Sequence, residues 1–200
     1  MEKLEIISQI IKSRRTIKPR QMDSEREVPK EILHQIMENA NWAPTHGLTE
    51  PWRFKIFTGK SRKILAEKLM CTYLENTPEN AFSQAKMDKL GRNPLLAPVI
   101  MAVCLHRDRN GNIPLVEEIE SVACSVQNIH LTASAVGLGG FWSTPKILET
   151  NAIKEFLRLG NEDLCLGLFY IGWLKSNENM PKGNRTPVSG KIEWCDFVSD

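Results

Sequence analysis

The sequence has few cysteines, and their spacing excludes two structural classes. The five cysteines are odd in number, widely separated and never form a C-x-x-C pair. Zinc modules and disulfide-rich scaffolds depend on paired or regularly spaced cysteines, so the sequence supports neither class. We therefore expect all five to be reduced thiols in the core.

Long apolar runs are also missing. The longest, from Leu95 to Leu105, contains Pro98 and reaches only about half of the 20 residues that a membrane-spanning helix needs. The N-terminus enters an amphipathic pattern at once, without the apolar stretch and cleavage site of a signal peptide. These absences predict a cytoplasmic protein that does not bind membranes.

Net charge is small. The sequence has 26 Lys and Arg against 24 Asp and Glu, a balance of +2 that is too weak to predict binding to nucleic acid. Its hydrophobic share of 42% and charged share of 25% are close to globular averages. A chain of 200 residues can build one core but is too short for two ordinary domains. We expect a single domain over residues 1–200.

The common catalytic and nucleotide-binding motifs are absent as well. There is no G-x-S-x-G motif, and the four histidines show no H-E-x-x-H or similar ligand spacing. A glycine-rich stretch begins at Gly137, but the sixth position of a dinucleotide fingerprint is occupied there by Trp142. The sequence therefore indicates neither a catalytic metal nor a side-chain nucleophile.

Apolar periodicity predicts more helix than strand. Helical spacing is found at residues 2–13, 30–40, from 61 onward, 79–92, 115–137 and about 149–158. Strand patterns are found at residues 53–58, 97–106 and 164–174, and the last two are apolar throughout, as in strands buried on both faces. A polar tail follows from Lys175. This succession predicts an α+β layer fold with about four strands.

Three local features are candidates for a binding site. Five positive charges fall within residues 12–20, which suits phosphate oxygens, although a solvated basic loop would show the same run. Residues 41–52 place a histidine and two tryptophans in one loop, and residues 139–145 combine glycines with hydroxyl side chains. Together they are the parts needed to hold a flat ring attached to a phosphate.

In order along nearly the whole chain, these residues resemble the FMN-dependent nitroreductase family, especially its compact bacterial NAD(P)H nitroreductases. The motifs are Ser13-Arg14-Arg15-Thr16, Ala43-Pro44 through Pro51-Trp52-Arg53-Phe54, the stretch 137–142 and Ile171-Gly172-Trp173. The resemblance implies a central, mostly antiparallel sheet of four to five strands surrounded by helices, with a C-terminal tail that extends to the partner subunit. It also implies a homodimer with one FMN per subunit at each end of the interface.

The resemblance further implies the site residues. Those that would bind FMN are Arg14, Arg15, Thr16, Trp42, His46, Trp142, Ser143, Thr144 and Arg185. Those that would lie near the nicotinamide are Thr132, Ala133, Ser134, Ala135, Val136 and Gly137. No side-chain acid, base or metal is needed, because the flavin carries the electrons.

Two positions depart from the family pattern. Many members have Asn at the position of Leu48 and Gln at that of Glu50, so the usual amide contact with the flavin is missing and His46 is the expected substitute. Arg185 matches a C-terminal basic residue that often reaches the phosphate, and a tail residue in solvent is the alternative interpretation.

The expected function is that of an FMN-dependent NAD(P)H oxidoreductase, which transfers hydride through the flavin to nitroaromatic, quinone or related acceptors. One alternative is a non-catalytic or regulatory flavin-binding protein of the same fold, to which the departures at Leu48 and Glu50 point. Another is a flavin-free basic interaction module, which depends on residues 12–20 alone. The sequence favours neither NADH nor NADPH.

Overall fold

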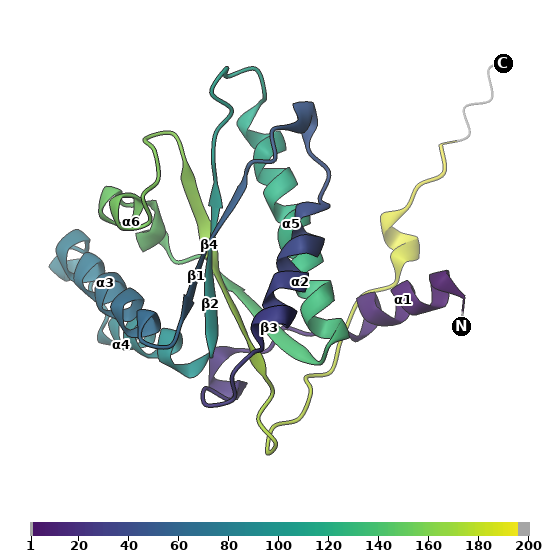
Figure 1. The fold of residues 1–200 in the computed structure, drawn as a ribbon, viewed down its shortest axis with the longest axis horizontal. Helices are drawn as coiled ribbons and strands as arrows, with labels where there is room; N and C mark the ends of the chain where they lie inside the picture. Colours follow the sequence, from purple (N-terminus) through teal and green to yellow (C-terminus); the bar gives the residue numbers. More distant parts are fainter. Residues whose placement is uncertain (1, 196–200) are drawn as a thin grey trace.

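A four-stranded antiparallel sheet forms the centre of the computed structural model, which describes residues 2–195 (Figure 1). Its strands are β1 (Trp52–Thr58), β2 (Val99–Leu105), β3 (Leu138–Ser143) and β4 (Leu164–Trp173), arranged in the order β1-β2-β4-β3. Because β3 and β1 lie at the two edges, β2 and β4 are paired on both sides. The predicted antiparallel α+β architecture is confirmed.

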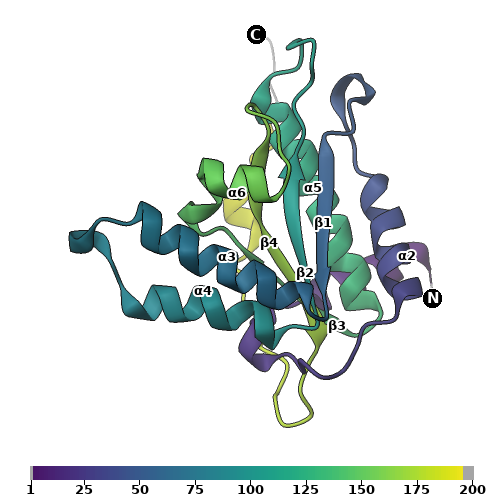
Figure 2. The same cartoon turned by 60° about the vertical axis from the view of Figure 1, so that its left-hand side comes forward.

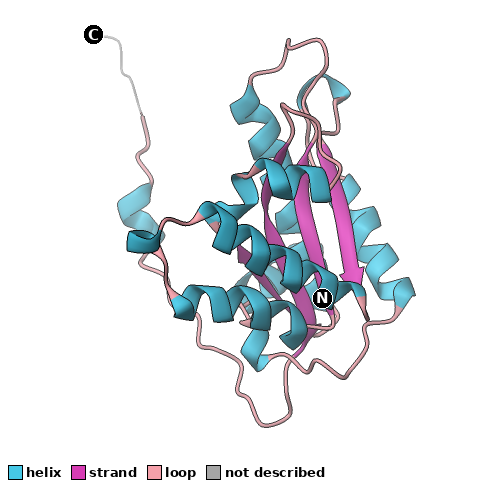
Figure 3. Cartoon of the chain, turned by 90° about the vertical axis from the view of Figure 1, so that its left-hand side faces the viewer, coloured by secondary structure: helices cyan, strands magenta, loops and turns pink. Residues whose placement is uncertain are grey.

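Helices cover both faces of this sheet (Figures 2 and 3). Within residues 2–195 the α-helices are α1 (Lys3–Ser13), α2 (Lys30–Asn41), α3 (Ser61–Asn76), α4 (Gln84–Leu96), α5 (Leu115–Ala135) and α6 (Asn151–Phe156). Helices α2 and α5 cover one face, whereas α3 and α6 cover the other and α4 packs against α3. Helix α1 projects from the body beside the end of α5 (Figure 1).

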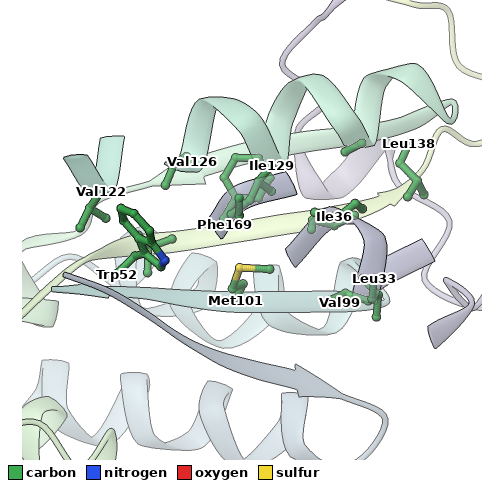
Figure 4. Close-up of a cluster of buried hydrophobic side chains, with 14 of the residues drawn as sticks. Leu33, Ile36, Trp52, Val99, Met101, Val122, Val126, Ile129, Leu138 and Phe169 are labelled. Carbon is green, nitrogen blue, oxygen red and sulfur yellow. The ribbon is translucent and has the colours of Figure 1, made fainter. Parts of the chain in front are cut away.

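Alternating residues of β2 divide the core into two halves. Val99, Met101, Val103 and Leu105 face α2 and α5, in the cluster drawn in Figure 4. The intervening residues, such as Ile100, face α3 and α6, so all seven residues of the strand are buried. A strand with both faces buried needs no polar alternation, which explains its continuous apolar sequence.

Several helix and strand boundaries differ from those predicted from the sequence. The long helix ends at Ala135 instead of residue 137, because Gly137 takes a φ of 83° in the left-handed conformation that ends helices. The helix predicted at 79–92 is a 3-10 turn at Glu79–Ala81 followed by α4, which continues to Leu96. Strand β3, which follows Gly137, has no counterpart among the predicted strands.

The cysteine prediction is partly wrong. Cys104 and Cys165 are buried, but Cys71, Cys124 and Cys195 are exposed. All five are free thiols, as expected for a reduced protein. Helices and loops, which the sequence pattern describes less well than the central strands, carry the three exposed ones.

Both ends of the chain leave apolar surface uncovered. No residue of α1 is buried, and Leu4, Ile7 and Ile11 are exposed along it. After β4 the chain turns below the sheet and runs outward, with Trp194 86% exposed (Figure 1). Among residues 2–195, no helix is both long and apolar enough to cross a membrane.

Candidate functional site

Three arginines gather where α1 ends. Arg14 is half-buried, and burial lowers the pKa of its guanidinium, as do the nearby charges of Arg185 and Arg15. None of the three forms a salt bridge within the part of the chain that the structure describes. Like charges that are held together without a carboxylate form a ready site for an anion such as phosphate.

The structure also separates the roles of these arginines. Arg15 donates from Nε to the carbonyl of Pro181 at 3.0 Å and from Nη1 to the carbonyl of Lys12 at 2.6 Å. Its guanidinium lies so close to Gly183 that a Cβ there would be 2.4 Å away. Arg15 therefore ties the C-terminal tail to the end of α1, and this anchoring brings Arg185 near Arg14.

His130 on α5 lies beneath the arginines and is absent from the predicted site. Its Nε2 lies 3.4 Å from Nη1 of Arg14 and 3.2 Å from the carbonyl oxygen of Arg15. Burial, and then the charge of Arg14, lower the pKa of His130 to about 4. The neutral ring can donate to the carbonyl or accept from the guanidinium, one at a time, and it thereby supports the anion site.

Two glycines allow the segment after α1 to lie against the edge of the sheet. Thr16 forms a bridge with Gly140, and the amide of Ile17 donates to the Gly140 carbonyl at 3.0 Å. A Cβ on Gly139 would lie 2.5 Å from Ile17, and one on Gly140 would lie 2.8 Å from His130. Only glycine leaves room here, so the predicted residues Arg14, Arg15 and Thr16 meet the start of β3.

The predicted residues at the end of β3 point in different directions. The indole of Trp142 turns inward, where its Nε1 is buried beside Gly167 and has no hydrogen-bond partner among the described residues. Ser143 and Thr144 instead line a cavity on the face that α3 and α4 cover. Beyond Gly140, whose carbonyl accepts from the amide of Ile17, the outer edge of β3 has no partner strand among the described residues and is open to a ligand.

Of the remaining predicted residues, only His46 lies at the other end of α5. Asn39, three residues before Trp42, is hydrogen-bonded to Asn128 and Thr132, which flank His130. Trp42 follows α2 and is 84% exposed, and Nδ1 of His46 lies 2.5 Å from Oε2 of Glu117. Leu48 and Glu50 both have positive φ, 53° and 43°. Non-glycine residues in this conformation are strained, and Asn tolerates it better than Leu does. The departure at Leu48 thus has a conformational cost.

A single chain does not bring the predicted cofactor residues together. His130, next to Arg14, and Glu117, next to His46, are separated on the same helix by a distance of about 20 Å, at 1.5 Å per residue. Figure 1 shows the 42–50 loop at the upper end of α5 and the end of α1 near its lower end. Within one chain, His46 is therefore remote from the arginines.

The predicted nicotinamide segment forms the C-terminal end of α5. Oγ1 of Thr132 accepts a hydrogen bond from Nδ2 of Asn39 at 3.0 Å, and Ala133 is buried. The amide of Gly137 donates to the carbonyl of Ser134 at 3.1 Å and closes the helix. These contacts are internal to the chain, and a nicotinamide role for this segment stays a prediction.

Fold and site define a class of protein: an α+β protein with a carboxylate-free arginine site at the open edge of its sheet. No group of three or more potential metal ligands occurs among the described residues. The chain belongs to the Nitroreductase family, which it matches over residues 11–173. The predicted family and enzyme class are confirmed.

Known relatives support the same assignment. "Putative NAD(P)H nitroreductase YdjA" of Escherichia coli K12 is 28% identical over 160 residues, covering 78% of this chain and 85% of that protein. A nitroreductase-like family protein from Bacillus cereus has a TM-score of 0.77 at 25% identity, covering 96% of both chains. The FMN-dependent nitroreductase NfnB from Mycobacterium smegmatis, solved with NADPH, has a TM-score of 0.74 at 17% identity, covering 97% of this chain and 100% of that chain. This last similarity concerns the fold alone.

Proposed function

We propose that the protein is an FMN-dependent NAD(P)H oxidoreductase that reduces nitroaromatic, quinone or related acceptors. One observation carries the proposal: Arg14, Arg15 and Arg185 meet at the edge of β3 without a carboxylate partner. A phosphate satisfies that charge, and a ring attached to it can follow the open strand toward Ser143 and Thr144. The name of YdjA points to the same chemistry.

The residues present fit FMN, and each would do a separate task. Arg14 and Arg185 would hold the phosphate, with Thr16 at the start of β3. Backbone groups of Trp142 and polar groups of Ser143 and Thr144 would orient the ring. When bound, FMN supplies hydride acceptance and donation, so the protein needs only to position reactants and exclude water.

The separation along α5 supports a homodimer as part of the proposal. In a two-fold dimer, Trp42 and His46 of one chain would meet the arginines of the other. The uncovered faces of α1, including Leu4 at 72% exposed, and of the C-terminal tail provide apolar surface for that association. The predicted extension of the tail to the partner subunit belongs to the same proposal.

Charge reversal at Arg14 tests the anion site. Arg14→Glu should lower FMN affinity at least about 10-fold, because it places a carboxylate against the phosphate. The matched control is Arg20→Glu, which makes the same change in the same basic run at an exposed residue. Bound flavin, measured by absorbance after reconstitution, should fall only in Arg14→Glu. If the flavin content of Arg14→Glu matched that of the wild type, the result would support the basic interaction module instead.

A second measurement separates the enzyme from a flavin-binding protein without turnover. The strained, atypical residues Leu48 and Glu50 favour that alternative. Anaerobic mixing of the flavin-loaded protein with NADH or NADPH should bleach the flavin absorbance if the protein is an oxidoreductase. Persistent absorbance with both donors would leave only the binding function.

The proposal treats residues 1–200 as one domain. Strand β4 contacts the N-terminal segment through Met22, and the tail contacts it through Arg15.

The proposal also places the protein in the cytoplasm. This location agrees with five free thiols, because disulfides are rare in that compartment. Fractionation of the native host cells tests the location.

A further inference from the structure

Two thiols that the proposed flavin chemistry does not use lie opposite each other in the central strands. Cys104 on β2 and Cys165 on β4 are paired in the antiparallel register, next to an irregularity between Val103 and Cys104. Both belong to the core half that faces α3 and α6. Opposed residues of antiparallel strands have Cα atoms about 4.5–5.5 Å apart, within the range of about 4.4–6.8 Å that a disulfide spans. The sheet therefore holds the two cysteines at a separation that a disulfide can bridge.

The two sulfur atoms are within hydrogen-bonding reach of each other. Sγ of Cys104 also lies 3.7 Å from the carbonyl oxygen of Ala102, and Sγ of Cys165 lies 3.8 Å from that of Gly167. A hydrogen bond from the Cys104 thiol lowers the pKa of Cys165, against the effect of burial. The same bond, together with burial, raises the pKa of Cys104. Of the two, Cys165 is therefore the better nucleophile, and Cys104 is its protonated partner.

A second cavity gives small molecules access to one member of the pair. It measures about 400 Å³, and Cys165 lines it, whereas Cys104 does not. Cys165 is 8% exposed and Cys104 is 0% exposed. The charged side chains of the wall are one carboxylate, Glu149, and one ammonium, Lys154. A wall of balanced charge attracts neither anions nor cations, so it suits a small neutral reagent such as hydrogen peroxide better than a large charged disulfide.

We propose that Cys104 and Cys165 form a redox-sensitive site, which hydrogen peroxide converts from two thiols to one disulfide. The Cys165 sulfur attacks a peroxide oxygen: an S–O bond forms, the O–O bond breaks, and the displaced hydroxide leaves as water with the thiol proton. Cys104 then attacks the sulfenic acid of Cys165, so that an S–S bond replaces the S–O bond and a second water leaves with the Cys104 proton. Both sulfurs are oxidised, and the peroxide is reduced to water. The step uses no flavin and no NAD(P)H.

Peroxide treatment of the purified protein tests the site. The variant Cys71→Ser/Cys124→Ser/Cys195→Ser first removes the exposed thiols, which would compete. Limited hydrogen peroxide should lower the mass of this variant by two hydrogen atoms, and peptide mapping without reduction should join the peptides that contain Cys104 and Cys165. Dithiothreitol should restore both thiols. Wild type, mapped in the same way, should yield the same linked peptides and so makes the result independent of the substitutions.

Two further replacements in this variant separate the roles of the pair. With Cys104→Ala, oxidation should stop at the sulfenic acid of Cys165, which dimedone traps, because no second thiol resolves it. With Cys165→Ala, Cys104 should remain a thiol, because it is buried, protonated and absent from the cavity wall. Dimedone labelling of the first should exceed that of the second at least about 10-fold.

Three results would overturn the proposal. If Cys104 and Cys165 stayed thiols while peroxide oxidised the exposed cysteines of wild type, the pair would only fill the core. Disulfides found only between two chains would contradict the pairing, and equal dimedone labelling of the two single replacements would contradict the assigned roles. None of these measurements uses NAD(P)H or depends on turnover, so failure of the proposed function would leave the redox site standing, and the converse also holds.

Discussion

His130 is neutral in the folded protein and charged in the unfolded chain over part of the acidic range. Its pKa is about 4 in the fold and 6.5 otherwise, mainly because of burial and secondarily because of Arg14. Between these values the unfolded state binds more protons, so stability rises with pH. Acidification from pH 6.5 to pH 4 should therefore cost up to about 3 kcal/mol through this residue.

Denaturant unfolding across this range, with wild type and His130→Gln, measures the effect. The variant removes the titrating group and should show a flatter dependence on pH. His34, exposed and paired with Glu38 at 3.7 Å, provides the control His34→Gln, which should keep the slope. Identical slopes in wild type and His130→Gln would show that another group titrates.

The site residues differ in how far sequence could reveal them. Arg14 and Arg15 stand out because five positive charges are concentrated in residues 12–20. His130 looks like any polar residue on an amphipathic helix, since its importance comes from burial between α5 and β3. Lys86, Lys89 and Lys146 line the same cavity as Ser143, but they lie on α4 and on the segment after β3, so only tertiary packing brings them together.

At the level of elements, the central strands are the most predictable part of the fold. Strands β2 and β4 are buried on both faces and therefore have continuous apolar sequences. Strand β3 begins Leu138-Gly139-Gly140, and glycine has low strand propensity, so its pattern does not predict a strand. Its glycines are required by the close approach of Ile17 and His130, which no local pattern shows.

The close packing of the segment after α1 on β3 can be tested by substitution. A Cβ in Gly139→Ala would lie 2.5 Å from Cβ of Ile17 and would force the segment away from the strand. We expect a loss of about 1–3 kcal/mol in the free energy of unfolding, as for other overpacked sites. Because Thr16 and Arg14 move with Ile17, FMN affinity should fall as well.

Gly190→Ala is the control for this change. Nothing lies within 4 Å of the position where its Cβ would be, so stability and flavin binding should match those of wild type. Denaturant unfolding and flavin titration measure the two quantities. An unchanged Gly139→Ala variant would contradict the close packing of the 14–17 segment on β3.

At the scale of the whole molecule, the proposed homodimer explains how separated site residues would meet. The arginines lie near one end of α5 and His46 lies near the other, so in the proposed dimer one chain would offer halves of two different sites. In a two-fold dimer each complete site takes one half from each chain. A site of this kind depends on association, and dilution that separates the chains should release the cofactor.

Complementation between two defective chains tests this arrangement. Arg14→Glu and the double variant Trp42→Ala/His46→Ala should each bind little FMN alone, because each spoils both sites of its own dimer. In a mixed dimer one site receives both defects, whereas the other receives none and recovers. Random exchange makes half of the dimers mixed, so flavin content and activity should return to about a quarter of wild type. If both halves of a site came from the same chain, mixing would restore nothing, and size-exclusion chromatography with light scattering would confirm that exchange had occurred.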